Sequence, residues 1–165
     1  MASVERVEYD GDGLSESMVA STPWDQLTRW LDAAVERGRQ HGDVPEPSAM
    51  SFATVDEDGH PNVRVVLLRL LDPRGPGFVT DTSSAKAREL ASTPYAAATL
   101  AWPALFRAVR FRGPVERVEQ EVVDGYFGSR PWDSRVSAWA STQSAPVSGR
   151  DELERAFAEF AERFP

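Results

Sequence analysis

The first long pattern along the chain is a helical spacing of apolar residues. They lie three or four positions apart and form one face: Trp24, Leu27, Trp30, Leu31 and Val35. Ser21, Thr22 and Pro23 stand before this face and supply a capping hydroxyl and a proline for a first helical turn. The pattern predicts an amphipathic helix from about residue 22 to residue 40. We expect the polar residues 1–20 to form an arm, followed by one domain over residues 21–165.

From Ala49 onward the apolar period changes to that of strands. Strands are predicted over residues 51–55, 63–71, 77–80, 96–102 and 107–118, with tight turns at 56–60 and 72–77. In the last strand Val109 and Phe111 alternate with Arg110 and Arg112. Helices are predicted over 85–91, 119–128, 134–140 and 149–164, the first of them capped by Ser83 or Ser84. This order predicts an α+β fold in which antiparallel strands form a small barrel with flanking helices.

Composition narrows the class of protein. The 165 residues have no cysteine and a formal charge of -8, which argues against disulfides and against general binding of nucleic acid. No run of 18 apolar residues occurs, and the first residues lack the layout of a signal peptide, so we expect a cytoplasmic protein without a membrane span. His41 and His60 are isolated, one in a loop and one in a turn, so no metal site and no hydrolytic triad is expected.

Two segments carry candidate chemistry in the strand region. Arg64 and Arg69 bracket a run of aliphatic residues, and a spacing of five places them on opposite faces of one strand. They are either ligand-binding cations or strand arginines that reach solvent. Residues 80–86 offer hydroxyls and Lys86, the sole lysine, at a predicted helix N-terminus. Such a segment is either an anion site or an ordinary capped helix.

The segment from Tyr126 to Ser144 places hydrogen-bonding groups around two tryptophans. Tyr126, Arg130 and Ser134 are spaced by four, and Pro131 bends the chain between them. A phenol, a guanidinium and a hydroxyl all donate to phosphate oxygens, so the three suit a phosphate monoester. They equally suit a packing corner between two helices. Gln143 and Ser144 either donate to a planar ring or end the following helix.

Taken together, residues 49–59, 64–69, 113–119 and 126–144 resemble the pyridoxamine 5'-phosphate oxidase family of flavoproteins. The resemblance implies an FMN-binding split barrel that forms a homodimer. It also implies an oxidase, in which FMN takes a hydride from a phosphorylated small-molecule substrate and O2 reoxidises it. The residues implied to bind FMN are Arg64, Val65, Val66, Leu67, Leu68, Arg69, Thr80, Lys86, Gln143 and Ser144. Those implied to bind substrate are Arg6, Tyr9, Arg69, Tyr126, Arg130 and Ser134.

The sequence departs from the family pattern at four of the matching positions. Arg69 stands in place of a usual lysine, Val79 of a tyrosine, Ala85 of an arginine and Ala108 of a glutamine. The pattern also continues beyond Pro165, so we expect the usual C-terminal segment to be lacking. Besides the oxidase, two hypotheses stay open. One is a weakly flavin-binding or non-catalytic protein that binds a phosphorylated ligand such as pyridoxal phosphate. The other is a flavin oxidase of secondary metabolism, of the phenazine type.

Overall fold

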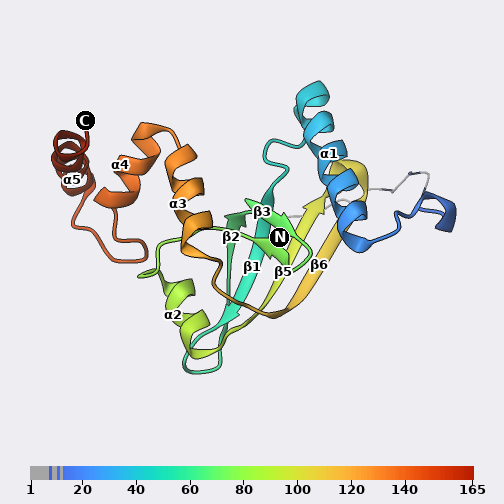
Figure 1. Cartoon of the computed structure of the whole chain (residues 1–165), viewed down its shortest axis with the longest axis horizontal. Helices are drawn as coiled ribbons and strands as arrows, with labels where there is room; N and C mark the ends of the chain where they lie inside the picture. Colours follow the sequence, from blue (N-terminus) through green and yellow to red (C-terminus); the bar gives the residue numbers. More distant parts are fainter. Residues whose placement is uncertain (1–7, 9–10, 12) are drawn as a thin grey trace, which may run out of the picture. The chain divides into compact units, whose positions relative to one another are not determined.

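A computed structural model describes residues 8, 11 and 13–165 of the chain. Its elements in order are η1 (Glu16–Met18), α1 (Pro23–His41), β1 (Ala49–Val55), β2 (Pro61–Leu67), β3 (Leu70–Asp72), β4 (Gly75–Gly77), α2 (Ala85–Ser92), β5 (Tyr95–Trp102), η2 (Pro103–Leu105), β6 (Arg107–Pro114), α3 (Gln120–Ser129), α4 (Trp132–Ala140) and α5 (Arg150–Arg163) (Figure 1). Four strands form a sheet in the order β2-β1-β5-β6, and β3 pairs antiparallel with β4. The predicted α+β class is confirmed.

Helix α1 begins and ends where its sequence favours it. Thr22 is the N-cap residue, and its hydroxyl accepts a hydrogen bond from the backbone N–H of Asp25 at 3.1 Å. Gly42 ends the helix in the left-handed conformation, with φ of 72°. Inside the last turns, Gly38 lies against the next loop, because a Cβ placed there would stand 2.4 Å from the carbonyl oxygen of Val44. The predicted helix is therefore confirmed, with ends set by these local contacts.

The described residues divide into two compact units. The first comprises the residues up to Phe52 together with Val65–Gly77 and Ala98–Phe111. Its core includes Leu27, Met50, Phe52, Leu68, Leu100 and Trp102. The indole N–H of Trp102 donates to the carbonyl of Pro47 at 2.8 Å, so this buried ring has a partner for its polar atom.

Helix α1 packs on β6 within the first unit. The rings of Trp24 and Phe111 stack at 6.5 Å, and the guanidinium of Arg107 lies 5.5 Å from the centre of the Trp30 ring. The burial of β6 alternates residue by residue, as predicted, with Val109 and Phe111 on the less exposed face. Ala108 and Arg110 occupy the exposed face of this strand.

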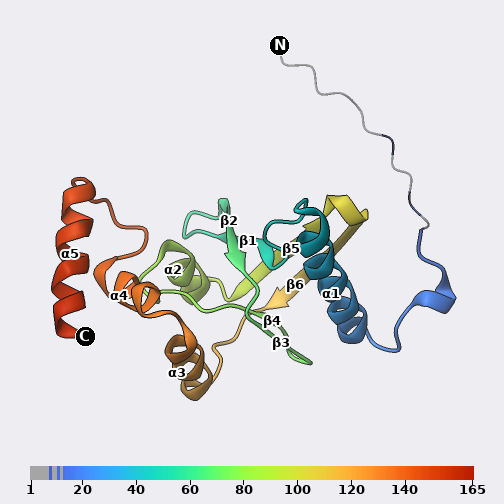
Figure 2. The same cartoon turned by 90° about the horizontal axis from the view of Figure 1, so that it is seen from above.

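The second unit comprises Ala53–Arg64, Phe78–Ala97 and Arg112–Pro165. Its helices α4 and α5 lie side by side (Figure 2). The ring of Trp132 meets that of Phe157 edge-on at 6.2 Å, and its indole N–H donates to the carbonyl of Phe164 at 2.6 Å. Trp139 stacks on Phe160 at 6.4 Å. Aromatic contacts thus hold the C-terminal helix hairpin together.

Two strand predictions are wrong, and a third strand ends earlier than predicted. The segment predicted as one strand over 63–71 is not continuous, because β2 ends at Leu67. The N–H of Leu68 donates to the carbonyl of Ser48, and that of Arg69 donates to the carbonyl of Gly77. Arg64 and Arg69 therefore do not share one strand. The strand predicted over 77–80 is β4, which ends at Gly77. The last sheet strand stops at Pro114 rather than at residue 118, and the N–H of Val115 donates to Pro94 instead.

Candidate functional site

The N-terminus of α2 is the best-defined polar site in the second unit. Ser84 is its N-cap residue and is fully buried, and its hydroxyl donates to the carbonyl of Asp81 at 2.7 Å. The backbone N–H of Ala85 donates to the hydroxyl of Ser144 at 3.1 Å. Ser144 holds a left-handed conformation, with φ of 70°, which a serine rarely adopts. A loop distant in the sequence is thereby fixed over the start of this helix.

Lys86 lies in the first turn of α2 and is 7% exposed. Its ammonium donates to the hydroxyls of Thr80 at 3.0 Å and Ser84 at 3.3 Å, and to the amide oxygen of Gln143 at 2.7 Å. All three of these acceptors are neutral. Burial lowers the pKa of Lys86, the charge of Arg64 lowers it further, and the charges of Asp81 and Glu89 oppose this. A buried cation held by neutral oxygens favours the approach of an anion.

Asp81 organises the loop that enters α2. Its carboxylate accepts from the N–H and the hydroxyl of Ser83, both at 2.7 Å, and from the N–H of Gln143 at 3.4 Å. The hydrogen bonds from Ser83 hold the pKa of Asp81 below its usual value. The carboxylate thus connects the loop before α2 to the segment that carries Gln143. Sequence reasoning did not select this residue, although Asp-x-Ser before a helix is a common turn signal.

Arg64 belongs to a second polar network beside this one. Its guanidinium donates to the hydroxyl of Thr54 on β1 and, at 2.8 Å, to the carboxylate of Glu89 on α2. Glu89 also accepts from the hydroxyl of Thr54, and from the side-chain amide of Asn62 at 2.8 Å. The side chain of Arg64 is 19% exposed and that of Glu89 is 10% exposed. Thr54, Asn62 and Glu89 were not expected to belong to a site.

The other residues predicted to bind the cofactor lie in the first unit. Leu68 is part of its core, whereas Val65 is exposed on β2. Arg69 is exposed, and its guanidinium donates to the hydroxyl of Ser48 at 3.3 Å. Val66 and Leu67 are half-buried at the end of β2. Their predicted roles stay predictions.

The residues predicted to hold a substrate phosphate lie on consecutive elements. Tyr126 is on α3, Arg130 follows the end of that helix, and Ser134 is on α4; all three are half-buried. The guanidinium of Arg130 lies 5.7 Å from the centre of the Phe127 ring. The bend at Pro131 is present between the two helices, as predicted. Arg6 and Tyr9 lie outside the described residues.

His60 is not isolated, contrary to the prediction. Its Nδ1 atom lies 3.7 Å from Oδ1 of Asp56, and Asp58 completes an acidic group in the β1–β2 turn. The same Asp56 oxygen accepts from the backbone N–H groups of Asp58 and His60. These groups shape an exposed hairpin turn.

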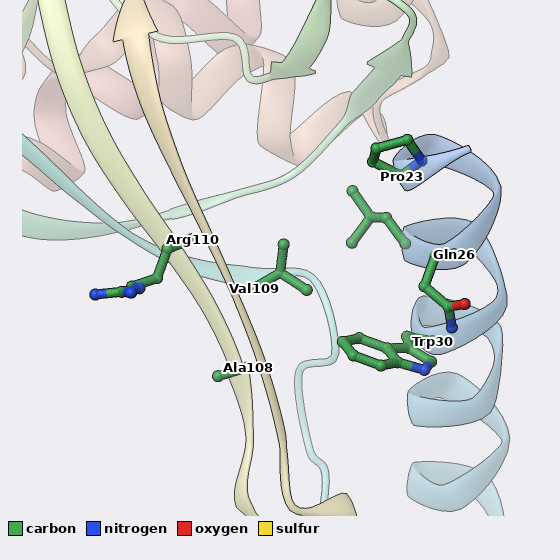
Figure 3. Close-up of a pocket in the computed structure, with 7 residues that line it drawn as sticks. Pro23, Gln26, Trp30, Ala108, Val109 and Arg110 are labelled. Atoms are coloured by element: carbon green, nitrogen blue, oxygen red, sulfur yellow. The ribbon is translucent and has the colours of Figure 1, made fainter. Parts of the chain in front are cut away.

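The first unit also contains a cavity of about 410 Å³ between α1 and β6 (Figure 3). Its lining is mainly apolar and comprises Pro23, Gln26, Leu27, Trp30, Ala108, Val109 and Arg110. The side chains of Trp30 and Val109 face one another across it, and that of Arg110 points away from the helix. Among the residues that the structure describes, none of those predicted to bind cofactor or substrate lines this cavity.

Comparison with known proteins identifies the family. The family model described as pyridoxamine 5'-phosphate oxidase matches residues 39–164. The chain belongs to this family. A pyridoxine/pyridoxamine 5'-phosphate oxidase of Pseudomonas paraeruginosa (strain DSM 24068 / PA7) is 49% identical over 160 residues, which cover 96% of this chain and 73% of the relative. The relative of that name in Rhodococcus jostii (strain RHA1) is 50% identical over 143 residues, which cover 86% of this chain and 62% of the relative. The family is thus one of oxidases.

Solved structures support the split-barrel fold of this oxidase-family chain. The crystal structure of PhzG from Burkholderia lata 383 in complex with tetrahydrophenazine-1-carboxylic acid matches with a TM-score of 0.81 and 29% identity, covering 93% of this chain and 74% of that one. A pyridoxamine 5'-phosphate oxidase-related, FMN binding protein from Nostoc punctiforme PCC 73102 matches with a TM-score of 0.60 and 20% identity, covering 82% and 73%. The second likeness concerns the fold alone. The predicted split β-barrel with flanking helices is confirmed. In the described part of the chain, none of the helices combines the length and apolar character needed to cross a membrane.

Proposed function

We propose that the protein is an FMN-dependent oxidase that acts on pyridoxamine or pyridoxine 5'-phosphate. The observation that carries this proposal is the buried Lys86 ammonium, which has neutral acceptors at the N-terminus of α2. A cation, a hydroxyl and a helix N-terminus form the donor set that a phosphate monoester requires. FMN carries such a phosphate, and family membership makes it the natural occupant.

The residues of the second unit fit the phosphate of FMN. Lys86 and Arg64 would supply charge, and Thr80 would supply a hydroxyl. Lys86 and Thr80 now donate to the amide oxygen of Gln143, and on binding they would donate to phosphate oxygens instead. The hydroxyl of Ser144 would keep the N–H of Ala85 satisfied. The redox chemistry, oxidation of the substrate with transfer of its electrons to O2, is what FMN supplies when bound.

The protein's own contribution is binding and orientation. Tyr126, Arg130 and Ser134 would hold the substrate phosphate, with Arg69 and the arm residues Arg6 and Tyr9 as further proposed contacts. Donors of this kind to a phosphate fix the position of the attached ring and raise its effective concentration at the flavin. Arg69 would grip by a planar fork rather than as a point charge, because it is an arginine.

We also propose a homodimer. Strand β2 lies at the edge of its sheet, and Val63 and Val65 on it are 65% and 64% exposed. An apolar edge strand of this kind favours contact with another chain. Sedimentation at micromolar protein with FMN present tests this, and a monomer alone would contradict it.

A second candidate function is oxidation of a polycyclic substrate, as in phenazine metabolism. It is favoured by the match to PhzG, which extends over 93% of this chain with a TM-score of 0.81. Arg69 and Ala108, which depart from the oxidase pattern, lie at positions where a different substrate would change the requirements.

Peroxide production separates these candidates. The FMN-loaded protein is supplied in parallel with pyridoxamine 5'-phosphate, pyridoxine 5'-phosphate, unphosphorylated pyridoxamine and a reduced phenazine carboxylic acid. The proposal predicts peroxide from the two phosphate esters and little from pyridoxamine. Peroxide from the phenazine alone would support the second candidate. A protein that holds FMN and oxidises none of them would contradict both.

A further inference from the structure

Glu89 is a carboxylate in the middle of α2 that no predicted role uses. Its side chain is only 10% exposed. Carboxylates are seldom buried in proteins unless they are paired with hydrogen-bond donors or cations. Burial by itself would raise the pKa of Glu89, but hydrogen bonds from Thr54, Asn62 and Arg64, with the charge of Arg64, hold that pKa below its usual value. Glu89 is therefore ionised at neutral pH.

The contacts of Glu89 connect three elements of the second unit. One carboxylate oxygen accepts from Arg64 and Thr54, and the other accepts from Asn62. Arg64 and Asn62 come from β2 and Thr54 from β1. Each oxygen thus meets a donor from the sheet, so the carboxylate ties α2 to the sheet and limits the positions open to the Arg64 guanidinium.

Lys86 and Glu89 are three residues apart on α2 and so project from the same side of the helix. The carboxylate that fixes Arg64 therefore also fixes the helix turn that carries Lys86. We propose that Glu89 is a positioning residue for flavin binding, which holds Arg64 and the first turn of α2 so that both cations meet the phosphate. This inference rests on the proposed binding of FMN at Lys86 and Arg64.

A role for Glu89 as a competitor of the phosphate would change FMN affinity in the opposite direction. If Glu89 only neutralised Arg64, it would compete with the phosphate for that cation. Removing the carboxylate would then tighten the binding of FMN. If Glu89 positions Arg64 and α2, its removal weakens FMN binding, because a charge-assisted contact is sensitive to geometry.

The experiment compares Glu89→Ala, Glu89→Gln and Glu57→Ala with the unaltered protein. Glu57 is an exposed carboxylate in the β1–β2 turn and controls for the change of net charge. Dissociation constants are measured for FMN and for riboflavin, which has the same ring system without the phosphate. We expect Glu89→Ala to weaken FMN by about tenfold or more and riboflavin by less than about threefold, and Glu57→Ala to change neither appreciably.

The pH profile gives a readout that a purely structural role would not move. Arg64, Asp81 and Glu89 are the charged groups that affect Lys86. Glu89→Gln removes the negative charge that favours the protonated lysine, so the loss of FMN affinity with rising pH should occur at a lower pH than in the unaltered protein. The glutamine keeps the size of the side chain, so this variant decides the question if Glu89→Ala does not fold.

Three results would contradict the positioning role of Glu89 without contradicting the proposal that the protein binds FMN. They are tighter FMN binding in either Glu89 variant, unchanged binding in both, or equal losses for FMN and riboflavin. A different result, equal affinity of the unaltered protein for FMN and riboflavin, would instead contradict the proposed function itself and this inference with it.

Discussion

Replacement of Lys86 by methionine separates two effects of the ammonium. One is its effect on the free energy of unfolding, and the other is its contribution to FMN binding. Methionine has a similar length and is uncharged, so it suits the volume that the lysine stem occupies. The partners of Lys86 also keep other hydrogen bonds. Thr80 still donates to Gln143 at 3.1 Å, and Ser84 still donates to the carbonyl of Asp81 at 2.7 Å. The substitution therefore leaves neither hydroxyl without a partner.

The two expected effects differ in size. Without ligand, the variant loses three hydrogen bonds but no longer buries an ammonium whose pKa is lowered by that burial. We expect the free energy of unfolding of Lys86→Met to change by less than about 1 kcal/mol. With FMN, the variant loses a charged contact of about 1.5–3 kcal/mol, which corresponds to a dissociation constant roughly 10- to 150-fold larger.

Urea unfolding of the ligand-free protein and titration with FMN measure these effects on the same preparations. Arg150→Met serves as the control, because Arg150 is an exposed cation on α5 that pairs with Glu154. Binding of FMN by Lys86→Met as tight as that of the unaltered protein would contradict a role for this ammonium in the flavin site. A loss of more than about 2 kcal/mol in the free energy of unfolding would also contradict this role, since the ammonium would then be mainly a structural group.

Four further predictions follow, the first on the charge of Lys86 and the others on separate parts of the chain. FMN affinity should fall as the pH rises through the lowered pKa of Lys86, below the 10.5 of an ordinary lysine, and Lys86→Arg should abolish this fall in titrations over the same pH range. Arg130→Ala should raise KM for the phosphorylated substrate about tenfold or more while the FMN dissociation constant stays nearly unchanged; equal losses would place Arg130 in the flavin site. Gly38→Ala should lower the free energy of unfolding by about 1–3 kcal/mol because its Cβ meets a backbone carbonyl, whereas Gly125→Ala, with open space in α3, should raise it by about 0.5–1 kcal/mol. Trp132→Ala should lower the free energy of unfolding by about 2–3 kcal/mol, because the contact between α4 and α5 is lost. Urea unfolding measures this, and an unchanged midpoint would contradict that packing.

Local signals in the sequence predicted the helices and most of the strands. Thr22 and Pro23 mark the start of α1, and the alternation of Val109 and Phe111 with arginines marks β6. The failed strand predictions have a non-local cause. The aliphatic run after Arg64 has the composition of one strand. The backbone N–H groups of Leu68 and Arg69, however, donate to the carbonyls of Ser48 and Gly77, and β2 ends before them.

The candidate site was only partly visible from the sequence for a similar reason. A hydroxyl-rich helix start with a lone lysine pointed to Lys86 and Thr80, because anion sites of that kind are local. In the sequence, Glu89 cannot be distinguished from any other polar residue on a short helix. Its partners Thr54 and Arg64 are 35 and 25 positions away, so only the folded chain brings the three together.

The decisive measurement for a flavin site at Lys86 and Arg64 is the absorbance spectrum of the purified protein after it has been mixed with FMN and desalted. The visible bands of oxidised flavin should remain with the unaltered protein and be lost with Lys86→Met. A protein that is colourless after desalting, and that leaves the spectrum of free FMN unchanged at high protein concentration, would contradict a flavin site at Lys86 and Arg64.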